Sequence, residues 1–259
     1  MSTYVMADIH GHLDEFLEML NQIGFSDEDK LIIAGDYIDR GNQSYEMLKW
    51  IEHRPDNVTL IKGNHDAEFA ECIDILDRAN NSYGLYESNP ADTKKIYKAI
   101  RQIPEIKDSC FDYYGTIENL IMYKDVNLSD LKRWASIIKA MPYVNKQNIN
   151  GKQFIIVHAG FYEDDKTPRE KLEWFYLYAR EKAYTAGGVK GATIIAGHTP
   201  TIIKGTPMYT DGKVYRFYDE KKDCTFYDID CGCAFNDSEW FLNGRLACIR
   251  LEDEEVFYI

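Results

Sequence analysis

The sequence predicts an α/β fold in which a helical insertion interrupts a largely parallel sheet. The first 65 residues contain three short apolar runs, at 4–7, 31–34 and 58–61. Short apolar runs bounded by turn residues are typical of buried strands, and the helical patterns between these runs favour parallel, right-handed connections. We therefore expect one domain over residues 1–259, with a helical insertion at about 66–140.

Two helices are predicted between the three N-terminal strands. The first has apolar residues at the i, i+3, i+4, i+7 spacing of an amphipathic helix, and Gly24 ends it. These residues are Leu13, Phe16, Leu17, Leu20 and Ile23. The second helix is predicted from Tyr45, Leu48 and Ile51, and Pro55 ends it because proline cannot continue a helix.

Three apolar stripes predict the helices of the insertion. The first stripe consists of Ile96, Ala99, Ile100 and Ile103. The second consists of Tyr113, Tyr114, Ile117, Leu120 and Ile121, and Gly115 weakens it. The third consists of Leu131, Trp134, Ala135 and Ile138, and we expect Ser129 to cap this helix.

Strands are predicted again after Pro142. Asn150 and Gly151 form a dipeptide that favours a two-residue hairpin, and the strand 154–157 follows it. A helix is expected around 169–184, ending at the glycine pair 187–188. The remaining expected strands lie at 193–196, 214–218, 225–229 and 245–251.

The charge and composition exclude several classes of protein. Acidic residues number 43 and basic residues 30, a net charge of −13 that argues against a binder of nucleic acid polymers or membrane surfaces. No apolar run approaches the roughly 18 residues of a membrane span. The six cysteines form no CxxC pair and no signal peptide is evident, so we expect reduced thiols and a cytoplasmic protein. Cys231 and Cys233 are expected to be packing residues, with a redox or ligand role as the alternative.

Polar side chains that can bind metals follow five of the predicted strands. They are Asp8, His10, Asp36, Asn64, His158 and His198. Ligand sites of open α/β sheets lie beyond the carboxyl ends of the strands, so we expect these side chains to converge. Imidazole, carboxylate and amide ligands suit Mn²⁺, Fe²⁺ or Zn²⁺. The set is too large for one ion with an open position, which favours two ions bridged by Asp36.

The polar segments at the strand ends resemble the ordered signature of the calcineurin-like metallophosphoesterases. The segments read Asp-Ile-His-Gly (8–11), Gly-Asp-Tyr-Ile-Asp-Arg-Gly (35–41), Gly-Asn-His-Asp (63–66), His-Ala-Gly (158–160) and Gly-His-Thr-Pro (197–200). They are most similar to the phosphoprotein-phosphatase branch, which includes bacterial Ser/Thr protein phosphatases and symmetrical diadenosine tetraphosphate hydrolases. The resemblance implies a four-layer αββα sandwich and two divalent metal ions, with Mn²⁺ preferred and Fe or Zn as alternatives.

The same resemblance implies a role for each site residue. Asp8, His10 and Asp36 would hold the first metal ion, and Asp36, Asn64, His158 and His198 the second. His65 would be the proton donor, oriented by Asp39, and Arg40 would bind the phosphate together with Asn64 and His65. Arg180 is the candidate for a second phosphate-binding arginine, and Arg169 is the alternative.

The expected function is hydrolysis of phosphate monoesters by attack of a metal-bound hydroxide, as in a bacterial-type Ser/Thr protein phosphatase. One alternative is a symmetrical bis(5'-nucleosyl)-tetraphosphatase. Another is an inactive metal-binding scaffold, although such a protein would be expected to lose His65, Arg40 or a metal ligand, and none is lost. The phosphorylated substrate is thus a phosphoprotein or a nucleotide, and the oligomeric state stays open.

The insertion is expected to set substrate choice and to take no part in the chemistry. Its ends lie beside motif-bearing strands, so its exposed tyrosines can line the approach to the metals. Tyr83, Tyr86 and Tyr97 are the candidates for this role.

Overall fold

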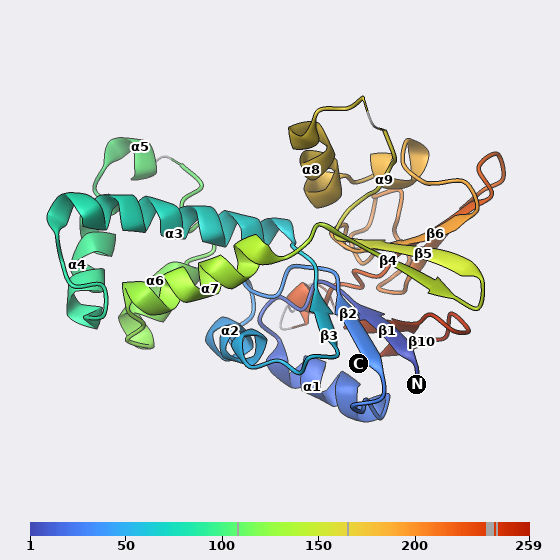
Figure 1. The fold of residues 1–259 in the computed structure, drawn as a ribbon, viewed down its shortest axis with the longest axis horizontal. Helices are drawn as coiled ribbons and strands as arrows, with labels where there is room; N and C mark the ends of the chain where they lie inside the picture. Colours follow the sequence, from blue (N-terminus) through green and yellow to red (C-terminus); the bar gives the residue numbers. More distant parts are fainter. Residues whose placement is uncertain (108, 165, 237–240, 242) are drawn as a thin grey trace.

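Two five-stranded sheets form the centre of the fold (Figure 1). The computed structural model describes residues 1–107, 109–164, 166–236, 241 and 243–259. The first sheet contains, in spatial order, β10 (Val256–Tyr258), β9 (Ala247–Arg250), β1 (Thr3–Met6), β2 (Lys30–Ile33) and β3 (Val58–Leu60). The second contains β4 (Val144–Ile149), β5 (Lys152–Val157), β6 (Ala192–Ala196), β8 (Cys224–Asp228) and β7 (Tyr215–Asp219).

Both sheets are mixed, with parallel strands at their centres. β1, β2 and β3 pair in parallel, and so do β5, β6 and β8. The outer strands pair antiparallel: β9 with β1, β10 with β9, β4 with β5, and β7 with β8. The hairpin between β4 and β5 is confirmed: Asn150 and Gly151 have φ angles of 53° and 80°, as a two-residue turn of this type needs. The expected parallel core is therefore present, but it is divided between two sheets.

The sheets pack face to face, and helices cover their outer faces. Val5, Ile32 and Ile249 of the first sheet pack against Ile156 and Ile195 of the second. On the outer face of the first sheet lie α1 (Leu13–Gln22) and α2 (Ser44–Glu52), and on that of the second lie α8 (Arg169–Tyr178) and α9 (Lys182–Thr185). The expected four-layer αββα sandwich is confirmed. It directs the loops after β1, β2, β5 and β6 toward one shared place.

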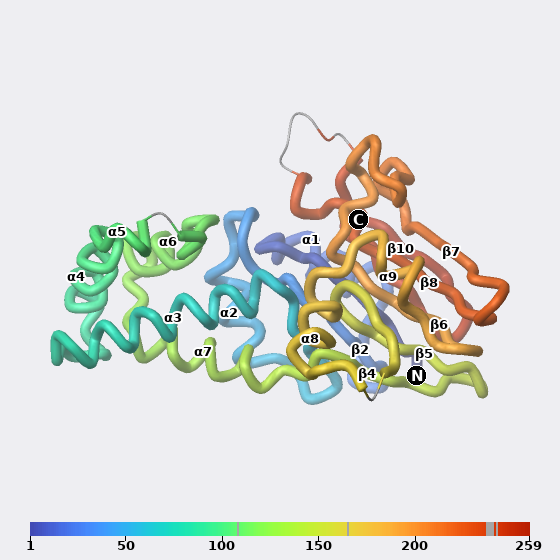
Figure 2. The backbone as a smooth tube through the Cα atoms, turned by 90° about the horizontal axis from the view of Figure 1, so that it is seen from above, coloured from blue at the N-terminus to red at the C-terminus, as the bar shows by residue number. Residues whose placement is uncertain are grey.

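The helical insertion extends to one side of the sheets (Figures 1 and 2). It consists of α3 (Asn64–Tyr83), α4 (Pro90–Ile100), α5 (Pro104–Lys107), α6 (Thr116–Tyr123) and α7 (Leu128–Ala140). α3 and α7 lie side by side and connect the insertion to the strands. The insertion shares one apolar core with the outer face of the first sheet, so it is anchored beside the strand ends. The single-domain organisation stays a prediction.

Several helix boundaries differ from those that the sequence predicts. The cap of α7 is Asn127, whose side chain accepts from the Asp130 amide at 2.9 Å, and not Ser129. Tyr113 and Tyr114 precede α6, because Gly115 takes a left-handed conformation with φ 72° at the helix start. The expected helix over 169–184 breaks where Ala179 becomes extended, and this break carries Arg180. No helix in the described part of the chain is long and apolar enough to cross a membrane.

Candidate active site

The six predicted metal ligands come together beyond the strand ends, in buried positions. Asp8 and His10 follow β1, Asp36 follows β2, Asn64 begins α3, and His158 and His198 follow β5 and β6. Four of them, and their neighbours Asp39 and Arg40, have backbone angles in the left-handed region. Their φ angles are 54° (Asp8), 49° (His10), 55° (Asp36), 73° (His198), 70° (Asp39) and 69° (Arg40). Such strain in non-glycine residues is concentrated at functional sites.

Asp36 lies at the centre of the cluster. Its Oδ2 atom is 3.5 Å from His10 Nε2, 3.5 Å from His158 Nε2 and 3.8 Å from His65 Nε2. Its Oδ1 atom accepts a hydrogen bond from the His65 amide at 3.0 Å. Two groups of possible ligands, His10–Asp36–His65 and Asp36–His158–His198, therefore share this carboxylate. This arrangement supports the predicted bridging position of Asp36.

Three polar side-chain atoms meet on one side of Asp36. Asn64 Oδ1 lies 2.9 Å from His158 Nε2 and 2.9 Å from His198 Nδ1, and these two nitrogens are 3.2 Å apart. His158 donates its Nδ1 hydrogen to the carbonyl of Ala34 at 2.9 Å, which leaves a lone pair on Nε2. The Nε2 lone pair of His158 thus faces the Asn64 oxygen at 2.9 Å, and two acceptors this close repel each other unless a cation lies between them. This donor set therefore fits a divalent metal ion.

His10 and Asp8 occupy the other side of Asp36. His10 donates from Nδ1 to the carbonyl of Ile38 at 3.0 Å, so its Nε2 lone pair faces Asp36. Both carboxylate oxygens of Asp8 accept from the His198 amide at 3.1 Å. Asp8 thus lies against the cluster but belongs to neither of the two groups that share Asp36, and its role as a ligand stays a prediction.

The protonation of the cluster suits metal binding. Burial lowers the pKa of His10 to about 3 and also lowers the pKa values of His158 and His198, so these imidazoles are neutral. Burial, Asp230 and Asp36 raise the pKa of Asp8 well above the usual range. Neutral imidazoles among crowded carboxyl groups form a site that divalent cations would stabilise.

Three further buried aspartates have no role in the sequence-based prediction. Asp66 accepts from the amides of Gly63 (2.9 Å), Asp36 (2.9 Å) and Tyr37 (3.1 Å), and so fixes the backbone around the bridging residue. Burial and Asp36 raise the pKa of Asp66 to about 7. Asp228 is the last residue of β8 and Asp230 follows that strand; burial raises the pKa of Asp230 to about 7. The signal that could have found Asp228 and Asp230 is their place after another apolar strand.

Two glycines allow the carboxylates to approach the backbone. A Cβ atom at Gly63 would lie 2.2 Å from Asp36 Oδ1, and one at Gly197 would lie 1.8 Å from Asp8 Oδ2. Neither glycine has a positive φ angle. The requirement at these two positions is therefore space for a carboxylate, and not a turn that only glycine can make.

His65 and Asp39 form a buried pair beside the cluster. His65 Nδ1 lies 2.7 Å from Asp39 Oδ2, and this contact orients the ring so that Nε2 faces the cluster. Burial lowers the pKa of His65, but the charge of Asp36 and the hydrogen bond to Asp39 outweigh burial and raise it. His65 is thus the imidazole most able to carry a proton into this site.

The candidate phosphate-binding arginines lie at the edge of the cluster. The Arg40 guanidinium carbon is 5.3 Å from the ring centre of Tyr114 and 5.4 Å from that of Phe235. Arg180 is exposed in the break between α8 and α9. The pKa of His198 is lowered first by burial, then by His158, and to a smaller extent by the charge of Arg180. Arg169 is exposed and pairs with Glu173 at 2.6 Å. These positions favour Arg180 over Arg169 as the second arginine.

The tyrosines expected to line the approach are not at the site. Tyr97 is buried and donates to Asp112 Oδ2 at 2.7 Å, so its expected exposure is wrong. Tyr83 and Tyr86 are exposed, but Tyr83 ends α3, about 27 Å from His65 along a helix that rises about 1.5 Å per residue. Tyr114 reaches the site instead: its ring centre is 4.7 Å from that of His65. Which tyrosine reaches the site depends on side-chain exposure and on the path of the loop before α6. The spacing of residues in the sequence predicts neither of these.

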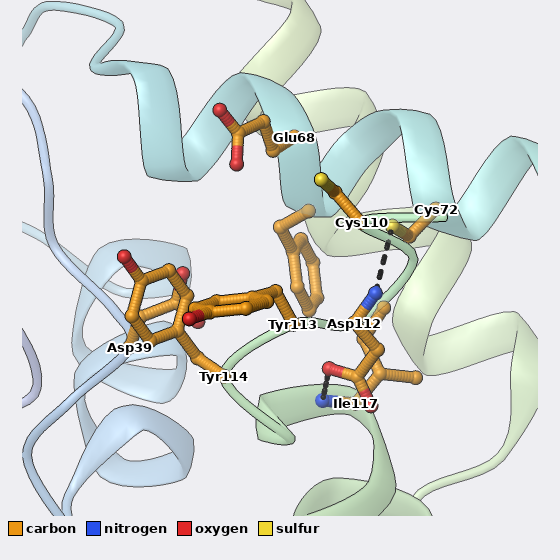
Figure 3. A pocket seen from close by; sticks show the side chains of 9 residues that line it. Asp39, Glu68, Cys72, Cys110, Asp112, Tyr113, Tyr114 and Ile117 are labelled. Atoms are coloured by element: carbon orange, nitrogen blue, oxygen red, sulfur yellow. Dashed lines mark hydrogen bonds between the residues drawn. The ribbon is translucent and has the colours of Figure 1, made fainter. Parts of the chain in front are cut away.

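A small pocket lies beside the His65–Asp39 pair, and Tyr113 and Tyr114 are among the residues that line it (Figure 3). Its walls come from α3, from the loop before α6, from Ile117 of α6 and from Asp39. Cys231 and Cys233 lie elsewhere: both are buried, and Cys233 belongs to the main apolar core. Their burial agrees with the expected packing role.

The sequence matches one protein family and is similar to proteins of known name. Residues 1–230 match the family model described as Calcineurin-like phosphoesterase. A protein of Salmonella arizonae named "Bis(5'-nucleosyl)-tetraphosphatase, symmetrical" is 40% identical, over 99% of this chain and 94% of that protein. A protein of the same name from Salmonella paratyphi B is 39% identical over the same shares of both chains.

Solved structures share the fold. The crystal structure of a metallophosphoesterase from Sphaerobacter thermophilus superposes with a TM-score of 0.53 and 13% identity, over 100% of this chain and 87% of that chain. The crystal structure of a candidate diadenosine tetraphosphatase gives a TM-score of 0.55 and 15% identity, over 99% and 92%. At these identities the likeness concerns the fold alone.

Proposed function

The chain belongs to the calcineurin-like phosphoesterase family, and we propose that within it the protein cleaves dinucleoside tetraphosphates at the centre of the phosphate chain. As a member of this family it is a metal-dependent phosphoesterase. The observation that carries the proposal is the 40% identity, over nearly the whole of both chains, with a protein named as a symmetrical tetraphosphatase. The Ser/Thr protein phosphatase expected from the sequence has less support and becomes the second candidate.

The proposed reaction consumes one water molecule and breaks one P–O bond. The water oxygen bonds to one of the two central phosphorus atoms, and the bridging oxygen leaves with the other half of the substrate. Two nucleoside diphosphates result. Two divalent ions, for which we propose Mn²⁺ with Fe or Zn as alternatives, would activate the water and neutralise the charge that develops on the phosphate.

The chain's own residues bind the phosphate and supply the proton. Arg40 and Arg180 would hold phosphate oxygens through planar guanidinium groups, and Asn64 and His65 would contact the same phosphate. His65, oriented by Asp39 at 2.7 Å, would donate its Nε2 proton to the bridging oxygen as that oxygen leaves.

A cavity of about 240 Å³ adjoins Arg40. It is lined by Arg40, Gly41, Asn42, Ser44, Tyr114, Gly115, Thr116 and Asn119. Asn42 and Asn119 present amide groups that can pair with the edge of a base, and Tyr114 offers an aromatic ring. We propose this cavity for one nucleoside of the substrate, because Arg40 can hold the adjoining phosphates at its entrance.

A comparison of products and rates tests the proposal. With Mn²⁺ present, diadenosine tetraphosphate is expected to give ADP alone, at two molecules per substrate. Its kcat/KM is expected to exceed that of a phosphoserine peptide by at least about 100-fold, because a site built for the polar groups of one substrate discriminates strongly against another. Chromatography of the products and phosphate release from the peptide measure both quantities.

The outcomes separate the two candidates. Formation of AMP and ATP would exclude symmetrical cleavage. A phosphopeptide preferred over the dinucleotide would favour the Ser/Thr phosphatase. p-Nitrophenyl phosphate serves as the control in both cases, since it reports the metal centre without either nucleoside or peptide.

A further inference from the structure

The helical insertion touches the His65–Asp39 pair through one side chain. Thr116, the first residue of α6, donates from Oγ1 to Asp39 Oδ1 at 2.5 Å. Asp39 uses its other oxygen, Oδ2, for His65 Nδ1 at 2.7 Å. All three side chains are buried. The sequence separates Thr116 from Asp39 by 77 residues, so only the fold brings them together.

The two contacts together fix the plane of the Asp39 carboxylate. With one oxygen held by Thr116, the carboxylate cannot rotate to present the other oxygen to His65. The backbone of Asp39 is held as well, because its amide donates to Ser44 Oγ at 3.1 Å. A histidine ring takes its orientation and tautomer from the acceptor bound to Nδ1. Fixing Asp39 therefore fixes the direction of His65 Nε2.

Thr116 is itself held by neighbouring residues of the insertion. Asp112 accepts from the amides of Ile117 and Glu118 at 2.8 Å each, which caps the start of α6. Tyr97 of α4 donates to the same carboxylate at 2.7 Å. Hydrogen bonds through Asp112 thus connect Tyr97 of α4 to the first turn of α6, which carries Thr116.

Tyr114 shields the same pair from solvent. Its ring centre lies 4.7 Å from that of His65, and its hydroxyl accepts from Arg40 Nη2 at 3.4 Å. Exclusion of water strengthens the polar contacts of His65. The loop before α6 therefore covers the proton donor on one side while Thr116 orients it from another.

From this geometry we infer that Thr116 is a positioning residue for proton transfer by His65. The inference rests on the proposed role of His65 as proton donor. It also corrects the expectation that the insertion sets substrate choice only, because an insertion residue completes the orientation of the proton donor.

The test compares two aryl phosphates that differ in leaving group. Phenyl phosphate has a poor leaving group and needs the proton, whereas p-nitrophenyl phosphate needs it little. Thr116→Val is expected to lower kcat on phenyl phosphate by about tenfold, part of the 10²–10⁴-fold that a positioned acid contributes. On p-nitrophenyl phosphate the loss is expected to stay below about threefold, with KM unchanged. Thr116→Ser, which keeps the hydroxyl, should restore most of the loss.

Two further variants make the result specific. Thr93→Val removes another buried threonine hydroxyl of the insertion, one that donates to the carbonyl of Asn89 and accepts from the amide of Leu128. Any loss in this variant should change both rates by the same factor. In a His65→Asn background, Thr116→Val should cost nothing more, because residues that act as one unit are not additive.

The outcomes that would overturn the inference are clear. An equal loss on both substrates, a full additional loss in the double variant, or loss of bound metal in Thr116→Val would each contradict it. If His65→Asn lowered the rates on both aryl phosphates by the same factor, His65 would not be the proton donor, and the inference about Thr116 would be wrong as well. Neither result depends on activity toward dinucleotides, so the substrate proposal is judged separately.

Discussion

Replacing Asp36 by asparagine is expected to lower kcat by about 10³-fold at saturating Mn²⁺, which corresponds to about 4 kcal/mol. Asp36 Oδ2 faces His10 on one side and His158 on the other, at 3.5 Å from each. One substitution therefore weakens both proposed ion positions. The asparagine keeps the size of the side chain but removes the charge that a bridging ligand supplies.

The matched control for this variant is Asp74→Asn. Asp74 is an aspartate on α3 that pairs with Lys139 on the surface, away from the cluster, and its replacement should leave kcat unchanged. Turnover of p-nitrophenyl phosphate, with circular dichroism to confirm folding, measures both variants. A folded Asp36→Asn protein with the wild-type rate would exclude a bridging role for this carboxylate.

Replacing His65 by asparagine is expected to lower kcat by about 10²-fold or more on substrates with poor leaving groups. The loss should be smaller on p-nitrophenyl phosphate, whose leaving group needs no proton. His65 Nδ1 is occupied by Asp39, and Nε2 lies 3.8 Å from Asp36 Oδ2, farther than the nitrogens of His10 and His158. The variant should therefore keep its bound metal.

Metal analysis of the His65→Asn protein decides this assignment. His53→Asn is the control, because His53 is exposed and its ring hydrogen-bonds to the backbone carbonyl of Lys49, away from the cluster. A metal content below that of the control would make His65 a ligand, in agreement with its place in the group His10–Asp36–His65, and would remove it from the role of proton donor.

The sequence predicts that the candidate metal ligands converge, because local rules determine where these side chains lie. A buried apolar strand followed by a polar side chain places that side chain at the edge of the sheet, and parallel strands share this edge. Asp36, His158 and His198 obey this rule and lie together in the structure. The ordered motifs then identify the family, and through it the four-layer arrangement.

The contacts made by the insertion could not be predicted in the same way. Thr116 reaches Asp39 across 77 residues, and nothing in the local spacing of α6 indicates which end faces the site. Residue type and place in the insertion point to Tyr83, Tyr86 and Tyr97, whereas Tyr114 reaches His65 because Gly115 turns the chain there. Asp66 belongs to the motif at 63–66, but its hydrogen bonds to three backbone amides depend on how the end of β2 packs against the start of α3. The cytoplasmic location stays a prediction.

The number and coupling of the bound ions test the dinuclear centre most directly. Metal-free protein titrated with Mn²⁺ is expected to bind two ions per chain, about 3.5–4 Å apart across Asp36. At that separation the two ions should give a spin-coupled electron paramagnetic resonance spectrum, and Asp36→Asn should lose the coupling. One ion per chain, or two ions with independent spectra in the wild-type protein, would contradict a centre bridged by Asp36.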